Sequence, residues 1–106
     1  MNLPKIALGA WAWGNDGTFG VNYTANELKD VFEEGMKNGL NLWDTAYAYG
    51  MGQSEKVLGE FTKNYDRNQL IISDKFTPQC EDGTQDAMKN MLNTSMNLLH
   101  TDYIDI

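Results

Sequence analysis

The chain has 106 residues, enough for one hydrophobic core and too few for a second complete domain. Its composition, 42% hydrophobic and 22% charged with two prolines, is that of a globular protein and excludes disorder as the default. Fifteen acidic against eight basic residues give a formal charge of -7, which disfavours nucleic acid and anionic membranes as partners because a field of that sign repels phosphate groups.

The cysteine content and the hydropathy of the sequence indicate in which cellular compartment the protein is expected. The single cysteine, Cys80, cannot form an internal disulfide, which fits a reducing environment. No apolar run is long enough for a secretion signal or approaches the ~18 residues of a membrane span. We therefore expect a cytoplasmic protein that does not bind membranes.

Four short apolar segments predict β-strands, at residues 5–9, 40–44, 70–73 and 103–106. Helical patterns separate them, and the strand centres lie roughly 30 to 35 residues apart, the size of a strand–helix–strand unit. Strands joined through helices run parallel. The sequence therefore predicts an α/β fold without an internal linker.

The first helix is predicted after Thr24, because Thr24 and Glu27 have the spacing of a capping box. Its expected apolar face consists of Leu28, Val31, Phe32 and Met36. Asn38 and Gly39 supply a left-handed stop.

A second, shorter helix is predicted to begin near Ser54 and to fray before Asn64. A third follows the loop at residues 77–83. Its expected inward face consists of Met88, Met91, Leu92, Ser95 and Leu99. Core packing explains these methionines better than a ligand site does.

Charged residues stand at the carboxyl ends of two predicted strands. Asp44 ends the second strand on the face opposite Trp43, and Lys75 follows the third. Ligands bind at the carboxyl ends of strands in parallel α/β proteins, although Asp44 alone could serve loop amides and Lys75 alone could be a solvated lysine. Trp43 is expected to pack between the sheet and the helices.

Several signatures of other chemistries are missing from the sequence. It has no phosphate-binding loop with its lysine, no paired cysteines, no histidine cluster suited to zinc and no dinucleotide-binding glycine fingerprint. Hydrolase and metal hypotheses are therefore weak, and no metal is expected.

Residues 40–59 are the most informative segment. They carry an Asp-Thr-Ala run at Asp44, a tyrosine five residues later at Tyr49, and then Ser-Glu and Leu-Gly. This pattern closely resembles the aldo-keto reductase family. Further stretches agree in order and spacing, at residues 8–14, 72–76 and 103–106.

The resemblance implies a partial (β/α)8 TIM barrel, with the first three βα units and the fourth strand, all strands being parallel. Such a barrel typically needs ~250 residues. Residues 1–106 are therefore expected to form the N-terminal fragment of a single aldo-keto reductase domain.

The resemblance also implies the chemistry. The parent would be an NADPH-dependent oxidoreductase that reduces an aldehyde or ketone by hydride transfer, with Tyr49 as general acid and Lys75 and Asp44 as its partners. A tyrosine hydroxyl suits this role, because it can protonate the developing oxyanion and a nearby ammonium stabilises the phenolate. The family's catalytic histidine lies beyond residue 106. His100 precedes the fourth strand and is expected to be a helix C-terminal cation instead.

The cofactor expected from the resemblance is NADPH (NADP+), and its site would include Gly9, Ala10, Trp11 and Asp44. Gly9 and Ala10 match a position of close backbone approach to the cofactor, with tight packing as the plain alternative. Trp11 and Trp13 could contact substrate and cofactor or serve as packing. The substrate would be a small-molecule carbonyl compound that the sequence does not identify.

The sequence is compatible with two further interpretations. The same barrel could serve as a nicotinamide-binding regulatory subunit, or an unrelated parallel barrel could resemble the family by chance. The isolated chain is expected to be inactive and to self-associate, because an open barrel exposes sheet edges and an apolar face. Alternatively, it could persist as a nicked piece of an intact barrel.

Overall fold

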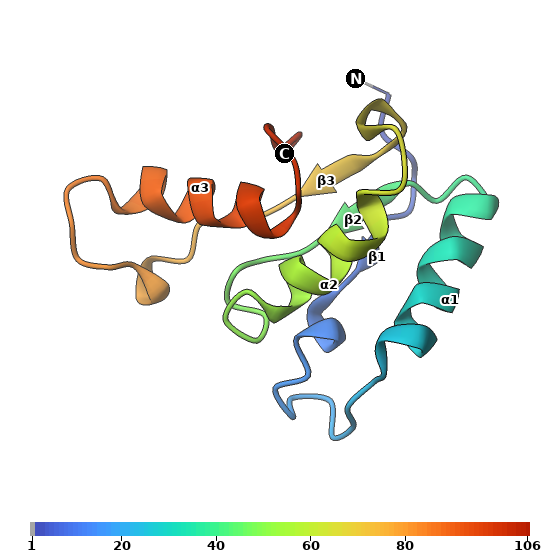
Figure 1. Ribbon diagram of the computed structural model, residues 1–106, viewed down its shortest axis with the longest axis horizontal. Coiled ribbons are helices and arrows are strands. Elements are labelled where there is room, and N and C mark those ends of the chain that lie inside the picture. Colours follow the sequence, from blue (N-terminus) through green and yellow to red (C-terminus); the bar gives the residue numbers. More distant parts are fainter. Residues whose placement is uncertain (1) are drawn as a thin grey trace.

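The computed structural model describes residues 2–106, along which strands alternate with helices (Figure 1). The strands are β1 (Leu8–Gly9), β2 (Leu42–Asp44) and β3 (Ile71–Ser73). The α-helices are α1 (Ala25–Lys37), α2 (Gln53–Thr62) and α3 (Ala87–Leu98), and short 3-10 turns form η1 (Trp11–Gly14), η2 (Arg67–Gln69) and η3 (Pro78–Cys80). The strands pair in parallel in the order β1-β2-β3, which confirms the predicted α/β class.

Each strand is shorter than predicted, and before β2 and β3 the reason is that backbone groups bond elsewhere. The Leu40 N–H donates to the Gly35 carbonyl at 2.9 Å, which closes the end of α1. The Leu70 N–H donates to the Arg67 carbonyl at 3.2 Å within η2. At β1, Ile6 is 56% exposed and the ladder begins only at Leu8.

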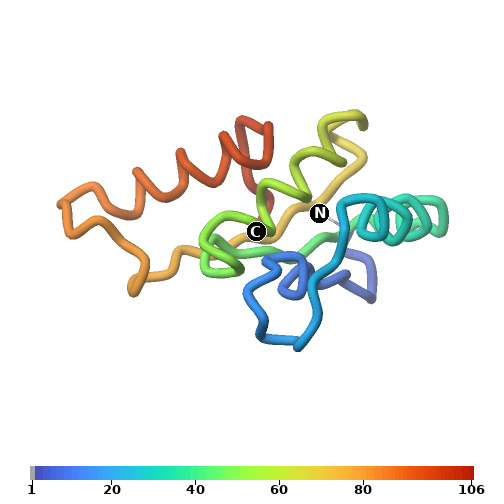
Figure 2. The backbone as a smooth tube through the Cα atoms, turned by 60° about the horizontal axis from the view of Figure 1, so that its bottom comes forward, coloured from blue at the N-terminus to red at the C-terminus, as the bar shows by residue number. Residues whose placement is uncertain are grey.

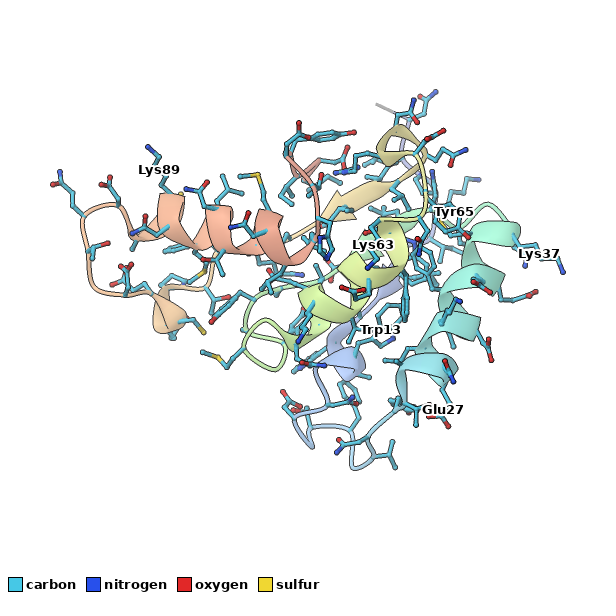
Figure 3. The ribbon with its side chains drawn as sticks, in the orientation of Figure 1. Trp13, Glu27, Lys37, Lys63, Tyr65 and Lys89 are labelled. Atoms are coloured by element: carbon cyan, nitrogen blue, oxygen red, sulfur yellow. The ribbon has the colours of Figure 1, made fainter. Side chains whose placement is uncertain are left out.

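Helix α1 forms as its sequence predicts. The Thr24 hydroxyl accepts the Glu27 N–H at 3.2 Å, while the Glu27 carboxylate accepts the Thr24 N–H at 2.8 Å. Glu27 and Lys37 mark opposite ends of the helix (Figure 3), an arrangement that favours the helix dipole. Gly39 then adopts a φ of +76°, which turns the chain into β2. Of the predicted apolar face, Val31 is 54% exposed, so the buried stripe is narrower than its sequence suggests.

The main core lies between the sheet and the helices, which lie on one side of the strands (Figure 2). Trp43 is fully buried at its centre, with its ring 4.8 Å from Phe32 and 5.4 Å from Trp13. Figure 3 shows Trp13 between α1 and α2, where its ring lies 5.9 Å from Phe61. The predicted inward direction of Trp43 is therefore confirmed, and Trp13 is a packing residue.

The predicted face of α3 is only half correct. Met91, Ser95 and Leu99 are buried, whereas Met88 is 62% and Leu92 is 45% exposed. Helical periodicity predicts which side chains share a stripe, but tertiary neighbours decide how much of that stripe is covered. The end of α3 that begins at Ala87 extends away from the sheet in Figure 1.

The predicted fourth strand, residues 103–106, does not form a regular strand, although it lies along β3. The N–H groups of Asp105 and Ile106 both donate to the Ile72 carbonyl, at 3.1 and 3.2 Å. The Ile72 N–H donates instead to the Asp105 carboxylate at 2.8 Å. The same carboxylate pairs with Arg67 at 2.6 Å. In a regular β-ladder a backbone carbonyl would accept the Ile72 N–H. Here the Asp105 side chain accepts it instead, which interrupts the strand.

No helix within residues 2–106 combines the length and the apolar character needed to cross a lipid bilayer.

Candidate active site

The ends of β2 and β3 bring Asp44 and Lys75 together, as predicted. The Lys75 ammonium donates to both Asp44 carboxylate oxygens at 2.8 Å and to the Thr45 carbonyl at 2.9 Å. Parallel pairing places Asp44 beside Ser73, so a residue just after β3 can reach it. One ammonium therefore receives three oxygen acceptors at the carboxyl end of the sheet.

The environment keeps Lys75 charged. Partial burial acts to lower the Lys75 pKa, but the hydrogen bond to Asp44 and the proximity of the Tyr49 side chain outweigh it, so the pKa is raised. The Lys75 and Asp44 side chains remain 44% and 33% exposed. A cation is thus held in place at a position that solvent and small molecules can reach.

Tyr49 lies beside this ion pair on the loop between β2 and α2. Its ring centroid is 5.1 Å from the Lys75 ammonium nitrogen. The next residue, Gly50, has a φ of +70°, and a Cβ there would lie 2.2 Å from the Gly14 carbonyl oxygen. Only a glycine permits this contact between η1 and the tyrosine loop. The loop backbone is therefore fixed directly behind Tyr49.

Trp11 is the second aromatic residue of the site. Its ring stacks on Tyr49, with centroids 5.5 Å apart and planes 14° apart. It also meets Phe19 edge-on at 5.4 Å and remains 48% exposed. Unlike Trp13, Trp11 thus presents an aromatic surface beside the Tyr49 ring.

Two of the predicted cofactor residues, Gly9 and Ala10, lie in different surroundings. Gly9 pairs with Asp44 in the sheet, and a Cβ at Gly9 would meet no atom within 4 Å. Ala10 is fully buried, its N–H donates to the Asp44 carbonyl at 2.9 Å, and its carbonyl accepts the Ser54 hydroxyl at 2.7 Å. The surface at Gly9 next to Asp44 is therefore open, whereas Ala10 is part of the supporting structure.

A buried hydroxyl pair supports the site from below, and the sequence did not assign it a role. The Thr45 and Ser54 hydroxyls lie 2.9 Å apart, and Ser54 donates to Ala10. Both side chains are fully buried. They tie the start of α2 to the ends of β1 and β2. The Ser-Glu pair in the sequence was the only signal of this network.

Glu55 is a further residue that sequence reasoning passed over. It is fully buried, and neither of its carboxylate oxygens has a hydrogen-bond partner of ordinary geometry. Burial, together with the negative charge of nearby Asp74, raises the pKa of Glu55 to about 8. In sequence, a glutamate in the first turn of a helix indicates a solvated residue, so its burial was not expected.

His100 lies outside this constellation. It follows α3 with a φ of +53°, and its Nε2 is 3.3 Å from a Glu60 carboxylate oxygen. This position agrees with its expected place at the helix C-terminus. Within residues 2–106, no group of three or more His, Cys, Asp and Glu side chains is placed to hold a metal ion.

A lysine bound to an aspartate beside an accessible tyrosine, all at the carboxyl end of a parallel sheet, defines the protein as an α/β protein with a candidate acid–base site. Residues 5–106 match the Aldo/keto reductase family. The chain belongs to this family.

Curated relatives extend the match over the whole chain. The chloroplastic pyridoxal reductase of Arabidopsis thaliana is 31% identical over 116 residues, covering 100% of this chain and 32% of the relative. Aldo-keto reductase YhdN of Bacillus subtilis is 32% identical over 113 residues, covering 100% and 34%. The chain thus spans about a third of the length of these relatives.

Solved structures agree with the fold. The thermostable aldo-keto reductase Tm1743, in complex with the inhibitor epalrestat, has a TM-score of 0.81 and 29% identity over 96% of this chain and 36% of that one. The aldo/keto reductase of Klebsiella pneumoniae in complex with NADP and acetate has a TM-score of 0.79 and 28% identity, covering 97% and 34%. The predicted partial TIM barrel is therefore confirmed for the three βα units.

Proposed function

We propose that residues 1–106 are the N-terminal part of an NADPH-dependent reductase that converts aldehyde or ketone carbonyls to alcohols. The observation that carries this proposal is the Lys75 ammonium, held by both Asp44 oxygens at 2.8 Å and 5.1 Å from the Tyr49 ring centroid. Family membership and neighbours solved with NADPH or NADP support it further.

In this proposal Tyr49 is the general acid. Its hydroxyl donates a proton to the substrate carbonyl oxygen as negative charge develops there. The Lys75 ammonium stabilises the phenolate that remains, and Asp44 holds the ammonium in position. Each tenfold gain in rate requires the activation free energy to fall by about 1.4 kcal/mol, and one close charge in a partly water-excluded site can supply that much stabilisation.

NADPH, when bound, supplies the hydride in this reaction. The residues proposed to form its site are Gly9, Ala10, Trp11 and Asp44. The open space at Gly9 and the exposed ring of Trp11 fit a planar ligand beside Asp44. The buried Ala10 contributes by fixing the β1 end rather than by direct contact, because both its backbone groups are already bonded.

The proposal is tested with the complete protein that carries this chain. Incubation with NADPH and a simple aldehyde should consume NADPH and release the alcohol, whereas residues 1–106 alone should show no turnover. NADPH binding without turnover of any aldehyde or ketone would instead favour a nicotinamide-binding regulatory subunit. Failure to bind NADPH at all would refute both.

We also propose that the isolated chain self-associates. Met88 and Leu92 expose apolar surface on α3, and β1 exposes a sheet edge that a closed barrel would pair, whereas residues 103–106 already lie along β3. Light scattering of residues 1–106 should detect oligomers, and a hydrophobic dye should bind. A monodisperse monomer that binds no dye would contradict this.

A further inference from the structure

Glu55 has a role that the proposed reaction leaves unassigned. It is fully buried, and both its carboxylate oxygens lack a hydrogen-bond partner. A buried carboxylate without partners is costly, whereas a neutral carboxylic acid carries its own donor. The protonated form is therefore the form that this site accommodates.

A carboxylate near Glu55 that can accept that proton is Asp74, which directly precedes Lys75. One Asp74 oxygen accepts the Lys75 N–H at 2.8 Å, and the Asp74 N–H donates to the Ile106 carbonyl at 3.0 Å. The second Asp74 oxygen is left for Glu55, whose other polar neighbour is the Ser95 hydroxyl on α3.

The charges around Glu55 do not favour its ionisation. From the end of β3, Asp74 adds a negative charge, while the Lys75 ammonium is engaged by Asp44 and Thr45. Helix α3 contributes the neutral Ser95, and its single charged residue, Lys89, points into solvent (Figure 3). On α2 itself, Lys56 and Glu60 are exposed.

We propose that Glu55 is a positioning residue, held as a neutral acid that donates a hydrogen bond to the Asp74 carboxylate and thereby fixes the backbone at Lys75. Ser54 binds α2 to β1 and β2, and Glu55 binds it to the end of β3. The two adjacent residues thus connect one helix start to all three strand ends that form the site. Only the effect on turnover rests on the proposed function.

The first test does not depend on turnover. Infrared difference spectra of the complete protein between about pH 6 and about pH 9.5 should show a protonated carboxyl carbonyl band that disappears at the higher pH. Glu55→Gln should remove this band. If no such band is present at about pH 6, or if it persists in Glu55→Gln, the proposal is overturned even in a fully active reductase.

The second test separates positioning from folding. Glutamine retains a donor toward Asp74, so Glu55→Gln should keep kcat within about twofold, whereas Glu55→Leu should lower kcat about tenfold with the cofactor KM unchanged. Equal losses in both variants would overturn the proposal. If the complete protein reduces no carbonyl compound, the test is an NMR titration of the Lys75 amine. The Lys75 pKa should shift in Glu55→Leu and should not shift in Glu55→Gln. An unchanged Lys75 pKa in Glu55→Leu would overturn the proposal.

Discussion

The buried Glu55 should make the stability of the protein fall as the pH rises. Its pKa is raised from an ordinary value of 4.5 to about 8 by burial and by Asp74. Between these values the folded protein keeps a proton that the unfolded chain releases, so rising pH favours unfolding. The maximum slope is about 1.4 kcal/mol per pH unit, and the loss from about pH 5 to about pH 7 is about 2–3 kcal/mol.

Glu55→Gln removes this titrating group while keeping its shape. We expect the free energy of unfolding, measured by urea denaturation from about pH 5 to about pH 8, to favour the variant increasingly as the pH rises. Taking the difference between the wild-type protein and the variant at each pH cancels groups that titrate alike in both. A difference that stays constant across this range would refute the assignment of a neutral Glu55.

Three further substitutions test particular contacts. Gly59→Ala places a Cβ 2.1 Å from the Leu98 carbonyl oxygen, so we expect urea denaturation to show about 1–3 kcal/mol of destabilisation. An unchanged urea midpoint of unfolding would contradict this packing of α2 on α3. The Cβ added by Gly9→Ala meets no atom within 4 Å, so the free energy of unfolding should stay within about 1 kcal/mol while NADPH binding to the complete protein weakens about tenfold. An unaltered Kd for NADPH would show that Gly9 is not part of the cofactor site. Asp105→Ala removes the oxygen that accepts the Ile72 N–H at 2.8 Å, so the protein should lose about 1–3 kcal/mol of stability and the Ile72 amide should exchange its hydrogen faster. Exchange at the wild-type rate would contradict this hydrogen bond.

The sequence pattern predicted that Asp44 and Lys75 stand at the carboxyl ends of neighbouring parallel strands, which lie at one edge of the sheet. That the two side chains pair was implied by the resemblance to the aldo-keto reductases, because the pattern alone also allowed separate roles for each residue. The face of Trp43 followed from the alternation of side chains along the same strand. The strand ends and the face of Trp43 depend on local pattern and chain direction, which a single sequence contains.

Other features depend on contacts between distant residues, and the sequence could not supply them. Glu55 is buried because the end of β3 and α3 cover it, although a glutamate near a helix start is usually solvated. Asp105 replaces a ladder acceptor for Ile72, which no apolar pattern indicates. Met88 belongs to the predicted apolar face of α3 yet is 62% exposed, since its coverage depends on neighbouring elements.

Tyr49 is proposed to donate the proton to the substrate beside the Asp44–Lys75 pair. The most direct measurement compares Tyr49→Phe with Tyr47→Phe, a matched change two residues earlier in the same loop, in the complete protein with NADPH and an aldehyde. Loss of the general acid should lower kcat by about 100- to 10,000-fold with NADPH affinity retained, while Tyr47→Phe stays close to the wild-type rate. A Tyr49→Phe variant that reduces the aldehyde at the wild-type rate would show that Tyr49 is not the general acid.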